Sequence, residues 1–270
     1  MRKIKRHSFL LAASGLFLVL PIVITGIYSF VSGWSDVLPR GFTADYYIQV
    51  FSDPRFWPSV FNGLVISILP ILISGVFVIL ALYTTILYCP ALDRYIQVLC
   101  MLPHTLKGVI LAISVLTLYA GSPTPFRNRI VMLTCVYCII ILPYVYQGIR
   151  NNLRAINVQQ LLEAAAILGA GKLYAFFRIV VPNMLSGILV SSLLGMSIIF
   201  SDYVIVKIIA GSRYITAQQL LYNARIQPEQ YSSVIVLVMF GIILLVSGTA
   251  YALNGRKGRD AGEPGGEEEA

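Results

Sequence analysis

The chain has 270 residues, of which 57% are hydrophobic and only 12% are charged, and its formal net charge is +8. A soluble domain carries about a quarter charged residues, so this sequence has too little polar material to cover a water-soluble fold. Its basic residues are not interleaved with aromatic residues on a soluble surface, which argues against nucleic-acid binding. The composition therefore indicates an integral membrane protein.

Six hydrophobic segments follow one another along the chain, each close to the ~20 residues that a helix needs to cross a bilayer. They cover residues 9–31, 60–88, 96–119, 130–149, 183–206 and 232–253. Because the bilayer core offers no partners for unpaired backbone groups, each segment is predicted to be helical. Pro21, Pro70, Pro103 and Pro143 are predicted to kink these helices rather than end them. The expected fold class is all-α, with six transmembrane helices.

Basic residues predict the orientation. With a cytoplasmic N-terminus, the segments on the inner side hold more Lys and Arg than those on the outer side. An even number of helices then places both termini in the cytoplasm. We expect residues 1–8 to form a short cytoplasmic N-terminus, 9–253 the membrane domain and 254–270 a disordered, acidic cytoplasmic tail. "MRKIKRH" is similar to the start of a signal peptide, but the apolar run is long and no Ala-x-Ala site follows, so a retained first helix is expected.

Residues for catalysis or metal binding are sparse. The two histidines, His7 and His104, lie far apart, and neither paired carboxylates nor a Ser/His/Asp set is evident. Cys135 and Cys138 form a C-x-x-C motif inside "MLTCVYCIIILP", without a second pair. In such a setting cysteine is expected to behave as a small apolar residue. We therefore expect no enzyme activity, no cofactor and no metal in this chain.

The stretch "EAAAILGAGKLYAFFRIVVP", residues 163–182, contains a Gly-Lys pair that could suggest a phosphate-binding loop. A Walker-type loop needs G-x-x-x-x-G-K-[ST] after a strand. Here Ala166 occupies the first glycine position and Leu173 replaces the hydroxyl residue. A dinucleotide-binding loop also fails, because Tyr174 stands where its third glycine belongs. The sequence therefore predicts that this stretch does not bind a nucleotide.

The same region is typical of two short helices joined by a turn. Asn157 is a suitable N-cap for a helix over 158–168, with Gln160 three residues later in a capping-box arrangement, and Gly169 is a suitable C-terminal stop. A second helix is expected over 172–180, with apolar residues on one side and Pro182 in the first turn of the fifth membrane helix. The apolar residues are Leu173, Phe176, Phe177 and Val180. An ordinary amphipathic connector is the alternative.

The spacing in this loop resembles the cytoplasmic signature of permeases of binding-protein-dependent ABC importers, E-A-A-x-x-x-G-x(9)-I-x-L-P. The matching residues are Glu163, Ala164, Ala165, Gly169, Ile179 and Pro182, and Val181 replaces the leucine. The resemblance implies a type I importer permease fold, in which a coupling loop over 150–182 docks on an ATPase subunit.

That resemblance also implies a set of partners in a bacterial plasma membrane. They are a second permease subunit, identical or homologous, two cytoplasmic ATPase subunits that hold ATP and Mg, and an extracytoplasmic substrate-binding protein. The permease itself would bind no cofactor. A secondary transporter is disfavoured, because no inverted repeat is evident.

Ionisable residues inside hydrophobic segments are costly and mark candidate pathway positions. Lys107 and Asp202 are the two candidates here, and Tyr144 and Tyr203 could also line a pathway. Asp202 could attract a cationic substrate, pair with Lys107, or lie near the outer boundary beside Lys207. These alternatives remain open at the level of sequence.

Two stretches of the sequence narrow the range of candidate substrates. "GWSDVLPRGFTADYYIQVF" (33–51) and "FSDYVIVKIIAG" (200–211) are similar to permeases of the spermidine/putrescine and 2-aminoethylphosphonate groups. An acidic pathway residue suits an amine-bearing solute by charge attraction. The resemblance favours a polyamine, with 2-aminoethylphosphonate as the alternative.

Overall fold

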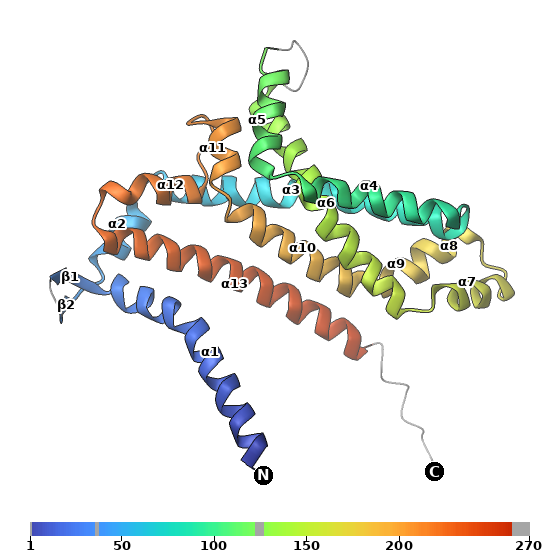
Figure 1. Cartoon of the computed structure of the whole chain (residues 1–270), viewed down its shortest axis with the longest axis horizontal. Helices are drawn as coiled ribbons and strands as arrows, with labels where there is room; N and C mark the ends of the chain where they lie inside the picture. Colours follow the sequence, from blue (N-terminus) through green and yellow to red (C-terminus); the bar gives the residue numbers. More distant parts are fainter. Residues whose placement is uncertain (1, 36–37, 122–126, 261–270) are drawn as a thin grey trace. The chain divides into compact units, whose positions relative to one another are not determined.

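The computed structural model describes residues 2–35, 38–121 and 127–260 (Figure 1). Its long elements are all helices, and the predicted all-α membrane fold is confirmed. The chain divides into two compact units, Met1–Phe61 with Thr216–Leu244 and Asn62–Ile215 with Leu245–Ala270.

Unit 1 contains the first and last long helices of the chain and a short hairpin. Its elements are α1 (Arg2–Ser29), β1 (Val31–Ser35), β2 (Leu38–Phe42), α2 (Asp45–Ser52), the first turns of α3 (Phe56–Leu87), α12 (Ala217–Asn223), a 3-10 turn (Ala224–Ile226) and most of the apolar part of α13 (Glu229–Asp260). The two strands pair antiparallel, with Val31 opposite Phe42 and Gly33 opposite Arg40.

A polar cluster holds the α2–α3 connection in unit 1. Arg55 donates hydrogen bonds to both carboxylate oxygens of Asp53, each at 3.2 Å, and the Tyr231 hydroxyl of α13 donates to Asp53 Oδ2 at 3.2 Å. The bonds from Arg55 lower the pKa of the Asp53 carboxyl below its ordinary value. The connection is therefore fixed to the first turn of α13 by an ionised carboxylate.

Unit 2 contains the remaining helices. They are the rest of α3, a 3-10 turn (Pro90–Leu92), α4 (Asp93–Thr105), α5 (Gly108–Tyr119), α6 (Arg129–Ala155), α7 (Val158–Ile167), α8 (Lys172–Ala175), a π-helical turn (Phe176–Val180), α9 (Val181–Asn183), α10 (Leu185–Phe200) and α11 (Val204–Ala210). Helix α6 packs against α4, α5, α10 and α11, so it is the centre of this unit.

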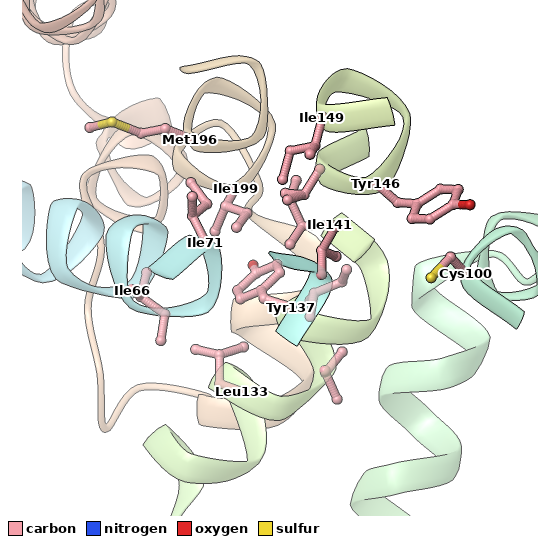
Figure 2. Packing of buried hydrophobic residues seen from close by; sticks show 14 of the residues in the cluster. Ile66, Ile71, Cys100, Leu133, Tyr137, Ile141, Tyr146, Ile149, Met196 and Ile199 are labelled. Atoms are coloured by element: carbon pink, nitrogen blue, oxygen red, sulfur yellow. The ribbon is translucent and has the colours of Figure 1, made fainter. Parts of the chain in front are cut away.

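The core of unit 2 forms where α6 meets α3 and α10. Figure 2 shows Tyr137 and Ile141 of α6 beside Ile71 of α3 and Ile199 of α10. The exposed fraction of Tyr137, Ile141 and Ile199 is at most 2%. A tyrosine of this size, buried at a helix–helix contact, fixes the spacing of the three helices around it.

Helices α6 and α10 approach each other through small residues. A Cβ atom added to Gly148 would overlap Ser191, and one added to Gly187 would overlap Asn152. The Asn152 amide donates a hydrogen bond to Ser186 Oγ at 3.1 Å, which adds a polar link to the same contact. Close backbone approach at small residues is what drives helix association where lipid tails compete with apolar side chains.

All six predicted hydrophobic segments lie mainly on helices. Among the described residues, three helices are each long and apolar enough to span a membrane without a second helix. These are Phe56–Leu87, Arg129–Arg154 and Glu229–Ala252. Two further segments are pairs of helices bent by more than 40°, and the apolar part of α1, Ser14–Ser29, is shorter.

The prediction of one continuous helix over 96–119 is wrong. Helix α4 ends at Thr105, α5 begins at Gly108, and the two are bent by 86°. Leu106 and Lys107 both have extended backbone. Pro103 lacks an N–H group and Gly108 is a poor helix former, so the chain has little to gain from continuing the helix here.

The prediction for 183–206 also needs correction. A 60° bend separates Lys172–Asn183 from Leu185–Phe200, so Pro182 precedes the bend instead of starting α10. The helix then stops at Phe200 and resumes in α11. Residues 201–203 form a break that contains Asp202, whose short polar side chain can bond to nearby backbone outside a helix.

The first residues of the predicted tail, 254–260, are helical. Helix α13 continues to Asp260, and no proline interrupts residues 254–260, so they extend the last helix. Residues 261–270 lie outside the described part of the chain. At the other end, residues 2–8 are the first turns of α1.

The close approach of α6 and α10 predicts a difference between two Gly→Ala substitutions. Gly148→Ala should lower the free energy of unfolding by about 1–3 kcal/mol, because the added methyl group overlaps Ser191. Gly75→Ala in α3 is the matched control: an added Cβ meets nothing within 4 Å, so it should be neutral or stabilise by up to about 1 kcal/mol. Unfolding of the purified protein in mixed micelles measures both. Equal effects would show that α6 and α10 do not meet here.

Candidate functional site

The segment between α6 and α10 begins with a capped helix. Asn157 Oδ1 accepts a hydrogen bond from the Gln160 backbone N–H at 3.4 Å, which confirms the predicted N-cap of α7. The cap satisfies one of the backbone donors that every helix start leaves unpaired. The segment therefore has a defined start only two residues after α6 ends.

The turn after α7 is a complete Schellman motif. Gly169 has φ +80°, its N–H donates to the Ala166 carbonyl at 3.0 Å, and the Ala170 N–H donates to the Ala165 carbonyl at 2.9 Å. Both bonds satisfy carbonyl groups at the helix end. The predicted role of Gly169 as a helix stop is confirmed, because glycine adopts this backbone conformation without a steric cost.

The second helix of the segment differs from the prediction. It runs without a break from Lys172 to Asn183, but Phe176–Val180 forms a π-helical turn. Phe176 and Val180 are fully buried, and the Phe176 ring meets the ring of Tyr83 of α3 edge-on at 5.1 Å. Leu173 is instead 58% exposed and Phe177 45% exposed. The single apolar side predicted from a regular period is thus divided into a buried and an exposed part.

The structure places the signature residues in different environments. Glu163, Ala164, Gly169 and Pro182 are exposed, Ile179 is half-buried and Ala165 is buried. Ala165 is therefore not part of the exposed surface of α7, to which Ala164 and Ala166 belong.

Two apolar side chains at the tip of α7 were missed. Ile167 is 86% exposed and Leu168 is 85% exposed, and Leu173 and Tyr174 are exposed a few residues later. The sequence gives one signal for this exposure. Ile167 and Leu168 come directly before the stop glycine, at the end of α7, where the buried side of the helix has already ended. An exposed apolar group of this kind, with the charge of Glu163 on the same helix, is a candidate contact surface for another protein.

Asp202 has a structural contact that the sequence did not reveal. Its Oδ1 accepts a hydrogen bond from the Ile205 backbone N–H at 3.1 Å, so the carboxylate caps the start of α11. The buried hydroxyl of Tyr137 is its neighbour, although the two do not meet hydrogen-bond geometry. The Asp202 carboxylate therefore occupies the break between α10 and α11.

Lys107 directly precedes α5, which contacts α11, but within the described residues it forms no ion pair with Asp202. A Cβ atom added to Gly108 would lie 2.9 Å from Ile205 Cδ1, so the start of α5 contacts α11. Lys107 itself is exposed, and within the described residues the structure forms no ion pair between Asp202 and either Lys107 or Lys207.

Of the two tyrosines predicted to line a pathway, the structure places Tyr203 next to Asp202 and Tyr144 elsewhere, on α6. Tyr203 directly follows Asp202 and precedes the first residue of α11. Tyr144 is half-buried on α6, two turns from Tyr137, and packs against the core. Within the described ranges, no group of three His, Cys, Asp or Glu residues could hold a metal ion, and Cys135 and Cys138 are free thiols.

Known proteins that are similar in sequence to this chain are transport permeases. No family model matches the chain. The spermidine/putrescine transport system permease protein PotC of Escherichia coli K12 is 22% identical over 255 residues, which cover 90% of this chain and 92% of PotC. A PotC homolog of Mycoplasma genitalium is 23% identical over 253 residues, covering 90% and 86%. PhnV of Salmonella typhimurium, named as a 2-aminoethylphosphonate transport system permease protein, is 21% identical over 192 residues, covering 69% and 71%.

Solved structures match the fold. A bacterial ABC transporter involved in the import of the acidic polysaccharide alginate has a TM-score of 0.64 at 18% identity, over 94% of this chain and 98% of the matched chain. The alginate ABC transporter in complex with an alginate pentasaccharide-bound periplasmic protein gives a TM-score of 0.67 at 16% identity, over 94% and 96%.

These matches define the class: the chain has the fold of an ABC importer permease and is similar in sequence to transport permeases, not to enzymes. It is a multi-pass membrane protein. Within the class, its sequence is similar to the spermidine/putrescine and 2-aminoethylphosphonate permeases, as the sequence analysis predicted.

The Schellman turn predicts different effects for two neighbouring glycines. Gly169→Ala should raise the free energy of the turn by roughly 1–2 kcal/mol, since an L-residue is strained at φ +80°. Gly171→Ala is the control, because Gly171 has φ −64° and its added Cβ meets nothing within 4 Å. Hydrogen exchange of the Gly/Ala169 and Ala170 amides should become about tenfold faster only in the first variant. Unchanged exchange would contradict the assigned turn.

Proposed function

We propose that this chain is the membrane-spanning permease subunit of an ATP-driven importer, and that its loop over 150–182 couples the translocation pathway to a cytoplasmic ATPase. The observation that carries the proposal is the exposed, rigidly capped tip of α7, with Glu163, Ile167 and Leu168 on its surface. ATP and Mg would be held by the ATPase subunits, and the permease would perform no chemistry.

The tip of α7 has the composition of a protein contact. Ile167 and Leu168 expose most of their side chains, and burial of each against a partner would contribute about 1.5–3 kcal/mol. Glu163 lies one turn before Ile167 on the same helix, where a basic residue of a partner could pair with it. An apolar centre with a charged edge is the usual anatomy of a specific interface.

The segment is also built to transmit movement. Both of its turns are fixed by hydrogen bonds, and its second helix is anchored by Phe176 against Tyr83 of α3. A ligand-driven transition needs two states that differ in their contacts at the bound surface. Movement of the docked ATPase subunits would then shift α6 and α10 as rigid bodies, in the manner of domain rocking.

The proposed assembly follows from this role. A second permease subunit, identical or homologous, would complete the pathway, two ATPase subunits would bind the coupling loops, and a substrate-binding protein would deliver solute on the opposite side. The excess of Lys and Arg in the predicted inner segments supports cytoplasmic termini in a bacterial inner membrane.

Glu163→Lys should abolish uptake and leave membrane insertion intact, because it reverses the charge at the edge of the docking surface. The measurement is ATP-dependent uptake in proteoliposomes that contain the binding protein, together with retention of the ATPase on the immobilised permease. Glu163→Gln keeps the size and loses only the charge, so its defect should be smaller. Full uptake by a well-inserted Glu163→Lys variant, or uptake that persists without the ATPase, would refute the coupling role; the second result would favour a secondary transporter.

The substrate we favour is a small amine-bearing solute of the polyamine type. Sequence similarity to PotC over 90% of the chain supports it, and 2-aminoethylphosphonate is the alternative because of the similarity to PhnV. Both solutes carry an amine that the Asp202 carboxylate could attract, with Tyr203, Tyr144 and Lys107 as further candidate pathway residues. Titration of the cognate binding protein with spermidine, putrescine and 2-aminoethylphosphonate separates the two.

Substitutions of Asp202 distinguish its charge from its capping role. Asp202→Asn keeps an oxygen for the Ile205 N–H but removes the charge, so it should raise the KM for putrescine at least about tenfold while stability is unchanged. Asp202→Leu removes the cap as well and should also lower stability by about 1 kcal/mol. A normal KM in the Asp202→Asn variant would restrict this carboxylate to a structural role.

A further inference from the structure

A pocket of about 440 Å³ lies where α3 and α6 reach the ends of their apolar spans, and α7 forms part of its wall. Its apolar lining comprises Leu82, Ile86, Pro90, Leu153, Val158 and Leu162. Its polar lining comprises Thr85, Asp93, Arg150, Arg154 and Gln159. The pocket thus combines apolar walls with two guanidinium groups at the level where a spanning helix meets lipid head groups.

The two arginines are unequal in their contacts. Arg150 donates a short charge-assisted hydrogen bond to Asp93 Oδ2, and its guanidinium lies 5.6 Å from the centre of the Tyr146 ring. The Tyr146 hydroxyl donates to the other Asp93 oxygen at 3.4 Å. Asp93 therefore neutralises Arg150 and holds it in place, with an exposed side-chain fraction of only 15% for Arg150.

Arg154 is left with its charge uncompensated. It is exposed, and it forms no ion pair within the part of the chain that the structure describes. Residues four apart lie on the same side of a helix, so Arg154 lies on the same side of α6 as the neutralised Arg150. Arg154 keeps its proton at physiological pH, so its charge is available to an anion in the pocket.

We propose that this pocket binds the phosphate group of an anionic phospholipid, with Arg154 as the main contact. An arginine fork matches two phosphate oxygens, and Gln159 offers an amide donor beside it. The glycerol and the first acyl carbons would lie along Leu82, Ile86 and Leu153. Basic pockets between membrane helices bind the head groups of anionic lipids by the same contacts.

The lipid would also stabilise the start of the coupling segment. Val158 and Gln159 belong to the first turn of α7, whose end carries a partial positive charge that favours a nearby phosphate. A bound head group would contact α6 and α7 together, across the two-residue connection between them. This site does not depend on the proposed function, because it requires only a protein embedded in a bilayer.

The test titrates the purified full-length protein, in non-ionic detergent, with phosphatidylglycerol, phosphatidylcholine or inorganic phosphate, and follows its melting temperature. Phosphatidylglycerol should raise the melting temperature saturably, and the other two should have little effect at the same concentration. Arg154→Gln should raise the half-saturating phosphatidylglycerol concentration by about fivefold to tenfold. Arg178→Gln, an exposed arginine of the same segment that does not line the pocket, should leave it unchanged.

Arg154→Lys gives a second check, since it keeps the charge and should retain part of the affinity that Arg154→Gln loses. Equal effects of phosphatidylglycerol and phosphatidylcholine would overturn the proposal, as would equal affinities of wild type and Arg154→Gln. The same loss in Arg178→Gln would show a nonspecific charge effect. Stabilisation by inorganic phosphate alone would identify a free-anion site and overturn the assignment to a lipid.

Discussion

The contact between α6 and α10 is the constraint on which the rest of unit 2 depends. The backbones of the two helices approach closely because a glycine without a side chain lies at each contact, Gly148 facing Ser191 and Gly187 facing Asn152. In a bilayer, where apolar side chains gain little by leaving lipid, such close packing supplies much of the association energy. Helix α6 leads into the segment that contains α7 and α8, and α10 leads out of it, so this contact fixes the two ends of that segment.

The breaks in the spanning segments occur at charged residues. The charges of Lys107 and Asp202 would be costly in the middle of an apolar helix, and each instead lies where a helix stops. Irregular backbone at such depth is tolerated when its polar groups find partners within the protein. The Asp202 carboxylate provides one such partner, because it accepts a hydrogen bond from the Ile205 N–H at the start of α11.

Features set by neighbouring residues were predictable from sequence, whereas those set by distant residues were not. The cap at Asn157 and the stop at Gly169 depend on hydrogen bonds within a few residues, and both were predicted. A kink at Pro103 was predicted, but the end of α4 at Thr105 and the restart at Gly108 were not, because average hydropathy does not register local backbone breaks. Neither was the burial of Phe176, which depends on Tyr83, nor the pair between Asp93 and Arg150, whose partners are 57 residues apart.

The segment between α6 and α10 combines local and tertiary order, as the proposed coupling role requires. Local hydrogen bonds make its turns rigid, so a force on the tip is not lost in bending. Tertiary contacts bury Phe176 and Val180 in the core of unit 2, whereas Ile167 and Leu168 at the tip of α7 are exposed. In the proposed coupling role, rigid turns, a buried base and an exposed apolar tip would together transmit the movement of a bound partner to α6 and α10.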